Sequence, residues 1–345
     1  MGIQKHRAHF SELPNAESSR AVISASQGKR WMKRGPLGLL GLKSQPELHS
    51  RPLQKTGNNQ SGPLCVGTEV DLIRFPDGTQ VPALGQGTWM MAEQPARRAD
   101  ELAALRAGVE LGLTLIDTAE MYADGESERL VGEAIRGLRE QVFLVSKAYP
   151  QNASRQRLPQ ACEASLKRLD TDRLDLYLLH WRGRVPLAET VEAMESLVAA
   201  GKIRRWGVSN LDTTDLQELV AAGGAACATD QVLYNLTRRG PEYDLLPWLA
   251  GQGIPVMAYS PVEQGRLLGN SQLREVAAGL GATPAQVALA WVLRHGHVMA
   301  IPRAGRVAHV QENRAAAELH LSANDLAALN AAFPRPGQRQ PLEML

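Results

Sequence analysis

From about residue 70 onward, short apolar runs alternate with amphipathic stretches. Segments such as ADELAALRAGVELG and LAETVEAMESLVAAG repeat apolar residues at helical spacing. Eight strands alternating with helices over ~230 residues is the pattern of a (β/α)8 barrel, an α/β fold. A doubly wound sheet would carry a glycine fingerprint after its first strand, and none is present. The apolar runs fall at 84–89, 113–118, 142–147, 174–180, 203–209, 228–234, 255–260 and 298–302.

The stretch VDLIRFPDGTQVPAL, residues 70–84, predicts a β-hairpin that opens the domain. Its two strand-like runs flank Pro76, Asp77 and Gly78, residue types that favour a tight turn. We therefore expect the barrel domain to span 67–345.

Residues 1–66 are polar, basic and rich in turn-forming residues, with no sustained apolar period. Such a start resembles a transit peptide, but Glu12, Glu17 and Glu47 interrupt it and no apolar core follows. We expect a disordered extension, with an upstream start codon wrongly chosen as the alternative.

The charge balance is uneven along the chain. The formal net charge is +2, made of +7 in residues 1–60 (ten Lys and Arg, three Asp and Glu) and −5 in the remainder (28 against 33). This balance favours neither a nucleic-acid nor a membrane partner, and no apolar run approaches the ~18 residues of a membrane span. Cys65, Cys162 and Cys227 are scattered, as in a reduced cytoplasmic protein. We expect a cytoplasmic monomer.

Candidate chemistry lies at the ends of the predicted strands. Asp117, Lys147 and His180 end three successive strands, and Tyr122 follows the first of them. Taken alone, a strand-terminal Asp is often a helix cap and a lone His a core residue. Active sites of such barrels form where the carboxyl ends of the strands converge. We therefore expect these four residues together to form an active site. Other polar strand-end residues are Ser209, Asn210, Gln231, Tyr259, Ser260 and Arg303.

These residue types suit reduction of a carbonyl group. Hydride addition places negative charge on oxygen, and an acid must protonate it. A phenol such as Tyr122 has an ordinary pKa near 10, which burial raises and a neighbouring ammonium lowers by about 1–3 units. We therefore expect Lys147 to contact Tyr122, Asp117 to keep Lys147 charged, and His180 to orient the carbonyl oxygen.

At these residues the chain resembles the aldo-keto reductases. The resemblance covers about 70–345 and includes LIDTAEMYADGESERLVGEAI, VFLVSK, LDLYLLHW, GKIRRWGVSN and MAYSPV. It implies a barrel reductase that binds a nicotinamide cofactor without a Rossmann domain, and it is strongest for the bacterial methylglyoxal and general aldehyde reductases. It implies a catalytic tetrad of Asp117, Tyr122, Lys147 and His180. The implied cofactor-binding residues are Ser209, Asn210 and Gln231 for the carboxamide, Tyr259 for the nicotinamide ring, and Ser260, Arg303, His309, Glu312 and Asn313.

One motif departs from the family. Its adenosine-phosphate motif usually reads Ile-Pro-Lys-Ser with a later arginine, but here Arg303 is followed by Ala304, and His309 takes the later basic position. The serine hydroxyl is missing, and a histidine is a pH-dependent cation. The resemblance implies NADPH, and these two departures leave NADH use open.

We expect Trp89 and Trp181 to line the substrate pocket, because each follows the carboxyl end of a strand. The connections 181–186 and 262–270 are short, and little follows residue 338. These short segments predict a pocket with low walls, and therefore small aldehydes or dicarbonyls as substrates.

His295 and His297 close a helix on the opposite face of the barrel, so no metal site is expected. The alternative function is a cofactor-sensing regulatory barrel resembling potassium-channel auxiliary subunits.

Overall fold

A computed structural model describes residues 70–345, so the predicted extension, residues 1–66, lies outside the described residues. The domain opens with the predicted hairpin, in which β1 (Leu72–Arg74) pairs antiparallel with β2 (Gln80–Pro82). Asp77 accepts a hydrogen bond from the Thr79 backbone N–H at 2.9 Å, and Gly78 supplies the positive φ of the turn.

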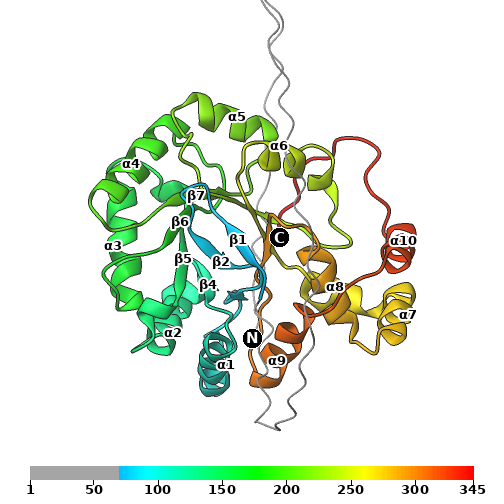
Figure 1. The fold of residues 1–345 in the computed structure, drawn as a ribbon. Coiled ribbons are helices and arrows are strands. Elements are labelled where there is room, and N and C mark those ends of the chain that lie inside the picture. Colours follow the sequence, from blue (N-terminus) through cyan, green and yellow to red (C-terminus); the bar gives the residue numbers. More distant parts are fainter. Residues whose placement is uncertain (1–69) are drawn as a thin grey trace, which may run out of the picture. The chain divides into compact units, whose positions relative to one another are not determined.

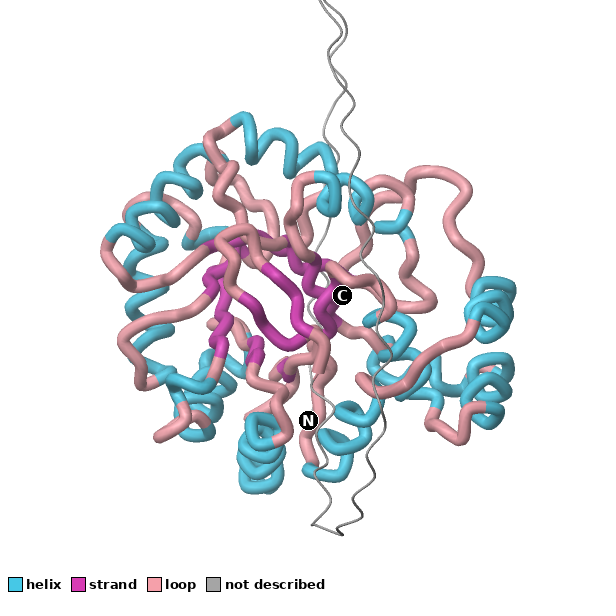
Figure 2. The backbone as a smooth tube through the Cα atoms, viewed as in Figure 1, coloured by secondary structure: helices cyan, strands magenta, loops and turns pink. Residues whose placement is uncertain are grey.

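Eight parallel strands form the predicted barrel, and each pairs with the next along the chain (Figures 1 and 2). Isolated bridges from Leu84 to Ala300 and from Gly87 to Arg303 join the last strand to the first. The predicted (β/α)8 fold is confirmed. The strands are β3 (Gln86–Gly87), β4 (Leu115–Asp117), β5 (Phe143–Ala148), β6 (Leu176–Leu179), β7 (Trp206–Ser209), β8 (Asp230–Leu233), β9 (Val256–Tyr259) and β10 (Val298–Ala300).

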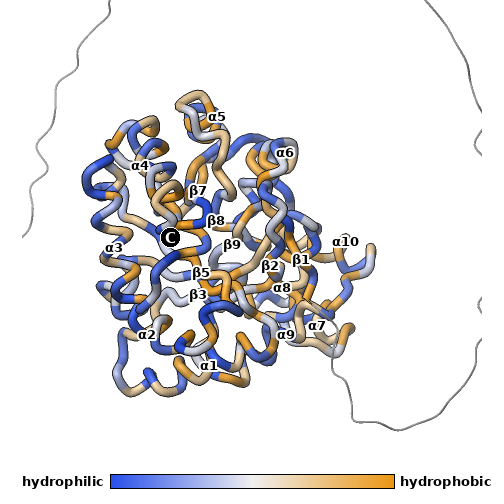
Figure 3. Tube along the Cα trace, turned by 60° about the vertical axis from the view of Figure 1, so that its left-hand side comes forward, coloured by the Kyte–Doolittle hydropathy of each residue, from blue (hydrophilic) through white to orange (hydrophobic). Residues whose placement is uncertain are grey.

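Helices surround the strands because their apolar stripes face inward, and hydrophilic and hydrophobic positions alternate along the outer ring (Figure 3). Capping boxes begin three of them: Asp212 with Asp215, Thr283 with Gln286, and Ser322 with Asp325. The helices are α1 (Arg98–Glu110), α2 (Glu126–Ala134), α3 (Arg157–Leu169), α4 (Leu187–Ala199), α5 (Thr213–Ala221), α6 (Leu245–Gly251), α7 (Ser271–Gly279), α8 (Pro284–Leu293), α9 (Val307–Ala316) and α10 (Ala323–Ala332).

The apolar interior has two parts. The larger lies between strands and helices, and the smaller fills the barrel near the amino ends of its strands. Ile73, Phe75 and Val81 of the hairpin pack with Leu115 and Met257 in the smaller part, so the hairpin closes this end of the barrel. Truncating a side chain such as Leu115, which is fully buried, would cost about 2–5 kcal/mol. The opposite end of the barrel, at the carboxyl ends of the strands, holds the candidate active site.

The helices of the described residues are short. No single helix there is long and apolar enough to cross a bilayer. Taken together, α7 and α8 are long and apolar enough, but the two helices meet at a bend of 88°.

Candidate active site

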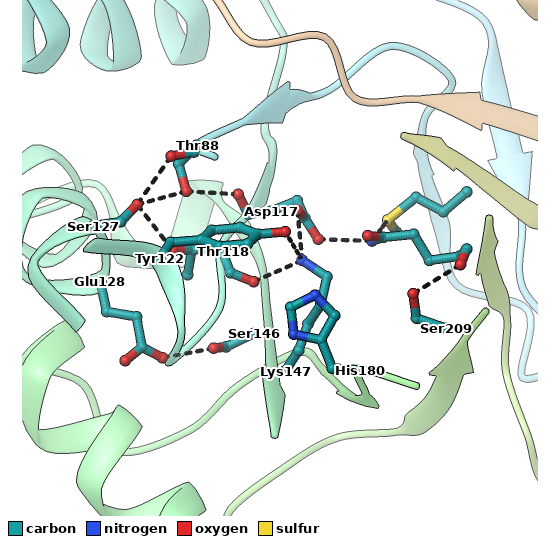
Figure 4. Close-up of polar contacts among 12 residues, drawn as sticks. Thr88, Asp117, Thr118, Tyr122, Ser127, Glu128, Ser146, Lys147, His180 and Ser209 are labelled. Atoms are coloured by element: carbon teal, nitrogen blue, oxygen red, sulfur yellow. Dashed lines mark hydrogen bonds and ion pairs between the residues drawn. The ribbon is translucent and has the colours of Figure 1, made fainter. Parts of the chain in front are cut away.

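Lys147 is the centre of the site, and its side chain has no exposed surface. It lies on β5 beside Asp117, the last residue of the neighbouring strand β4. Its Nζ donates to Asp117 Oδ2 at 2.7 Å, to the Thr118 carbonyl at 2.9 Å and to the Tyr122 hydroxyl at 3.0 Å (Figure 4). An ammonium has three N–H groups, so each has an acceptor. The contact of Lys147 with both Asp117 and Tyr122 is as predicted from the strand ends.

Asp117 is fixed at both carboxylate oxygens. Its Oδ1 accepts from Gln231 Nε2 at 2.8 Å, while Oδ2 accepts from Lys147. Burial raises the pKa of Asp117 and lowers the pKa of Lys147, and the attraction between the two charges opposes both shifts. Removing one partner of such a buried pair typically costs about 3–5 kcal/mol.

Tyr122 begins a short 3-10 helix, Tyr122–Gly125, and its half-buried ring faces the cavity described below. Burial and the Asp117 charge raise the pKa of its phenol well above the ordinary 10.0. Of the two opposing effects expected from the sequence, burial therefore sets the direction in the resting site. The consequence is a phenol that stays protonated at neutral pH and so has a proton to donate.

His180 directly follows β6 (Leu176–Leu179) and is 8% exposed. Burial and the nearby Lys147 charge lower the pKa of its imidazole to about 2, so the ring is neutral at physiological pH. Its centroid lies 5.8 Å from that of Tyr122, and the two rings meet edge to face. Its Nδ1 is buried with no hydrogen-bond partner in residues 70–345, and the residue also lines the cavity described below.

The predicted carboxamide residues form one hydrogen-bonded wall. Ser209 Oγ donates to the Gln231 carbonyl at 2.8 Å. The Asn210 amide donates to the His180 carbonyl at 3.1 Å and accepts from the Tyr259 hydroxyl at 2.9 Å. Asn210 has a φ of 60°, a left-handed conformation that asparagine tolerates better than most residues.

A cavity of about 680 Å³ lies beside the phenol and imidazole. This volume is typical of small-molecule sites. Trp89 and Trp181 line it, as expected. Sequence reasoning missed further lining residues, which include Met90, Met121, Val262, Gln264, Gly265, Met344 and Leu345.

The expectation of low walls was wrong on the C-terminal side. Met344 and Leu345 line the cavity, although they follow α10 by a segment without apolar period. An arginine holds this segment in place: Arg238 pairs with Glu343 at 2.5 Å and with Glu263 at 2.9 Å. Glu263 belongs to the segment after β9, which also contributes Val262 and Gln264 to the cavity.

The predicted cofactor-binding residues divide into two groups. Ser260, Arg303 and His309 line the same cavity as the carboxamide wall. Glu312 and Asn313 lie further along α9 and are not among its lining residues. Glu312 accepts a hydrogen bond from the Thr283 hydroxyl at 2.7 Å.

A buried hydroxyl network behind the site was also missed. Ser127 Oγ donates to Thr88 Oγ1 at 2.8 Å and lies 3.3 Å from Thr118 Oγ1 (Figure 4). Thr88 Oγ1 in turn donates to the Asp117 carbonyl at 3.0 Å. The network fixes the strand end that carries two of the three Lys147 acceptors.

The two histidines near β10 do not form part of this site. His295 Nε2 lies 3.1 Å from the Tyr234 hydroxyl. Across residues 70–345, no group of three His, Cys, Asp or Glu side chains is placed to hold a metal ion.

The barrel and its site define an oxidoreductase, and comparisons with known proteins give the family. The Aldo/keto reductase family model matches residues 83–333. Methylglyoxal reductase YeaE of Escherichia coli is 59% identical over 79% of this chain and 99% of its own. Glyoxal reductase of Bacillus subtilis is 33% identical over 76% of this chain and 92% of its own. The chain therefore belongs to the aldo/keto reductase family, as its motifs predicted.

A solved structure agrees with this assignment. The aldo/keto reductase from Klebsiella pneumoniae, in complex with NADP and acetate, superimposes with a TM-score of 0.78 at 55% identity. The match covers 80% of this chain and 100% of that one.

Proposed function

We propose that this protein reduces small aldehydes and dicarbonyls to alcohols with NADPH, and that Tyr122 is the general acid. The observation that carries the proposal is the placement of the Tyr122 hydroxyl 3.0 Å from a buried, fully hydrogen-bonded ammonium, at the edge of a cavity. The names of the Escherichia coli and Bacillus subtilis relatives support methylglyoxal and glyoxal as the substrate class.

The cavity residues fit a nicotinamide cofactor. The aromatic ring of Tyr259 and the amides of Asn210 and Gln231, all held by hydrogen bonds, border one cavity with the phenol. These amides would hold a carboxamide, and Arg303 and His309 would face a phosphate. When bound, reduced nicotinamide supplies the hydride for the carbonyl carbon.

The protein's own residues supply the proton and the orientation. The neutral His180 ring donates from Nε2 to the carbonyl oxygen and so orients the substrate. The Tyr122 hydroxyl gives its proton to that oxygen as negative charge develops there. Lys147 donates to the phenol oxygen and stabilises the phenolate that remains, and Asp117 keeps the lysine charged. The carbon thus gains a hydride and the oxygen a proton, which gives the alcohol.

The lining residues favour small, neutral and aromatic carbonyl compounds. Trp89, Trp181 and Met121 offer apolar surface close to His180 and Tyr122. Tyr149 meets Trp181 edge to face at 6.0 Å between ring centroids, which fixes the indole. An aryl ring or a short dicarbonyl chain can pack here while its carbonyl oxygen reaches the two donors.

Steady NADPH oxidation with methylglyoxal tests the proposal. Turnover near or above ~1 per second, the low end for enzymes, is the expected result. Binding of NADPH without turnover of any aldehyde in a panel would instead favour the regulatory barrel. The relatives named above are all described as reductases, so they support turnover.

A further inference from the structure

Glu101, on α1, joins two separate segments of the cavity wall. Its side chain is 2% exposed, and it accepts two hydrogen bonds with different carboxylate oxygens. Oε2 accepts from the Ala92 backbone N–H at 2.9 Å, and Oε1 accepts from Arg303 Nη2 at 3.2 Å. The first contact holds the segment that follows Trp89 and Met90, and the second holds the arginine expected to face the cofactor phosphate.

The first of these segments needs such a support. Met90 and Ala92 have φ values of 64° and 63°, left-handed conformations that are strained for residues other than glycine. Arg303 also donates to the Met90 carbonyl at 3.3 Å. Glu101 and Arg303 together therefore hold this turn from both its N–H and its carbonyl side.

The contact also sets the charge at this edge of the cavity. Arg303 is the strand-end cation among the lining residues, and its partner Glu101 is a buried carboxylate with little water to screen it. A phosphate that approaches Arg303 must share the guanidinium with Glu101 and meets the carboxylate charge behind it. Ala304 offers no hydroxyl to compensate.

We propose that Glu101 is a positioning residue that determines cofactor specificity by weakening the preference for NADPH over NADH. The inference rests on the proposed function, in which Arg303 faces the phosphate that only NADPH carries. Glu101 holds Arg303 toward the wall and cancels part of its charge. The affinities for NADPH and NADH therefore differ less than they would with the arginine alone.

The test is Glu101→Gln in the full chain, with the Kd of NADPH and of NADH measured by fluorescence titration. Glutamine keeps an oxygen acceptor for the Ala92 N–H and removes the charge. We expect the NADPH Kd to fall about tenfold, equal to ~1.4 kcal/mol, and the NADH Kd to change less than about twofold. Glu133→Gln is the matched control, because Glu133 pairs with Arg98 on the surface and its loss changes the net charge equally.

A double-mutant cycle shows whether Glu101 acts through Arg303. With Arg303→Ala present, Glu101→Gln should alter the ratio of the two Kd values by less than about twofold. If Glu101→Gln does not fold, Glu101→Asp replaces it. Its shorter side chain cannot span Ala92 and Arg303 together, so the ratio should shift at least about twofold toward NADPH.

Three results separate the inference from the proposed function. Equal changes in both Kd values, or an unchanged ratio, would overturn the role of Glu101 while NADPH-dependent turnover persists. Equal loss of NADPH and NADH affinity in Arg303→Ala would overturn the phosphate assignment and the inference with it. Absence of carbonyl reduction by the unchanged protein would instead refute the proposed function.

Discussion

The side-chain amide of Gln231 donates to Asp117 Oδ1 over 2.8 Å, between residues 114 positions apart in the chain. Gln231 lies on β8 and Asp117 on β4, so the bond crosses the interior of the barrel. It leaves the other carboxylate oxygen to Lys147. The lysine is therefore oriented by a carboxylate that cannot rotate without losing a buried hydrogen bond.

Tyr122→Phe should abolish most carbonyl reduction, because it removes the only group placed to protonate the substrate oxygen in the proposed mechanism. We expect kcat to fall by about 10²–10⁴, which is the usual contribution of general acid catalysis. The Kd of NADPH should stay nearly constant, since the hydroxyl acts on the reacting oxygen. Stopped-flow and titration measurements give both values, and a variant that retained most of its kcat would refute the assignment.

The stability of the protein should fall as the pH drops below about 6.5, because His180 is neutral in the folded state. Its pKa is lowered from 6.5 to about 2, so only the unfolded chain takes up a proton between these values. The contribution of His180 to the free energy of unfolding is therefore complete above pH 6.5 and is lost progressively as the pH falls below that value. At pH 5 the loss from His180 alone is about 2 kcal/mol.

Urea unfolding at pH 7 and pH 5 measures this effect. His180→Gln removes the titrating group, so its stability should change less between the two pH values than that of the unchanged protein. His295, whose pKa is lowered to about 4, contributes in the same direction and remains in both proteins. Identical pH dependence in the two proteins would show that His180 is solvated and protonates normally.

Arg238→Ala should loosen the cavity wall made by Met344 and Leu345. Arg238 is the shared partner of Glu263 and Glu343, so its loss frees the C-terminal segment from the segment after β9. We expect KM for an aromatic aldehyde to rise several-fold, about 1 kcal/mol or less of binding, with little change in kcat. Methylglyoxal, which is too small to touch this wall, should be affected less. Arg98→Ala, at a surface ion pair on α1, is the control.

Short dicarbonyls and simple aromatic aldehydes should exceed steroids and free aldoses in kcat/KM. The cavity of about 680 Å³ must hold both the nicotinamide end of the cofactor and the substrate, which leaves little room for a fused ring system. Free aldoses present several hydroxyl groups to Trp89 and Trp181, which offer apolar surface in return. A substrate panel with NADPH measures the order, and a steroid or aldose at the top would refute it.

The strand ends were predictable because neighbouring parallel strands bring their carboxyl ends to one face. Asp117 and Lys147 met as expected for this reason. The Ser127 network was not predictable, since a serine in the first turn of a helix is usually a solvated or capping residue. The wall made by Met344 depends on ion pairs such as Arg238 with Glu343, which join positions 105 apart and leave no local pattern. For the pKa of Tyr122 the two opposing effects were predictable from the sequence, but not which is larger, because that depends on the extent of burial.

The bridge between Gly87 and Arg303 and the ion pair between Glu101 and Arg303 have a consequence during protein synthesis. The ion pair joins residues 202 positions apart, so neither contact can form until nearly the whole barrel has left the ribosome. Loop closure over such a separation is slow compared with local helix formation. Until the last strand forms, the turn around Met90 therefore keeps its local hydrogen bond from the Ala92 N–H to Glu101 but lacks the contacts of Arg303. A nascent chain that stops before β10 would hold the tetrad residues without one edge of the cavity.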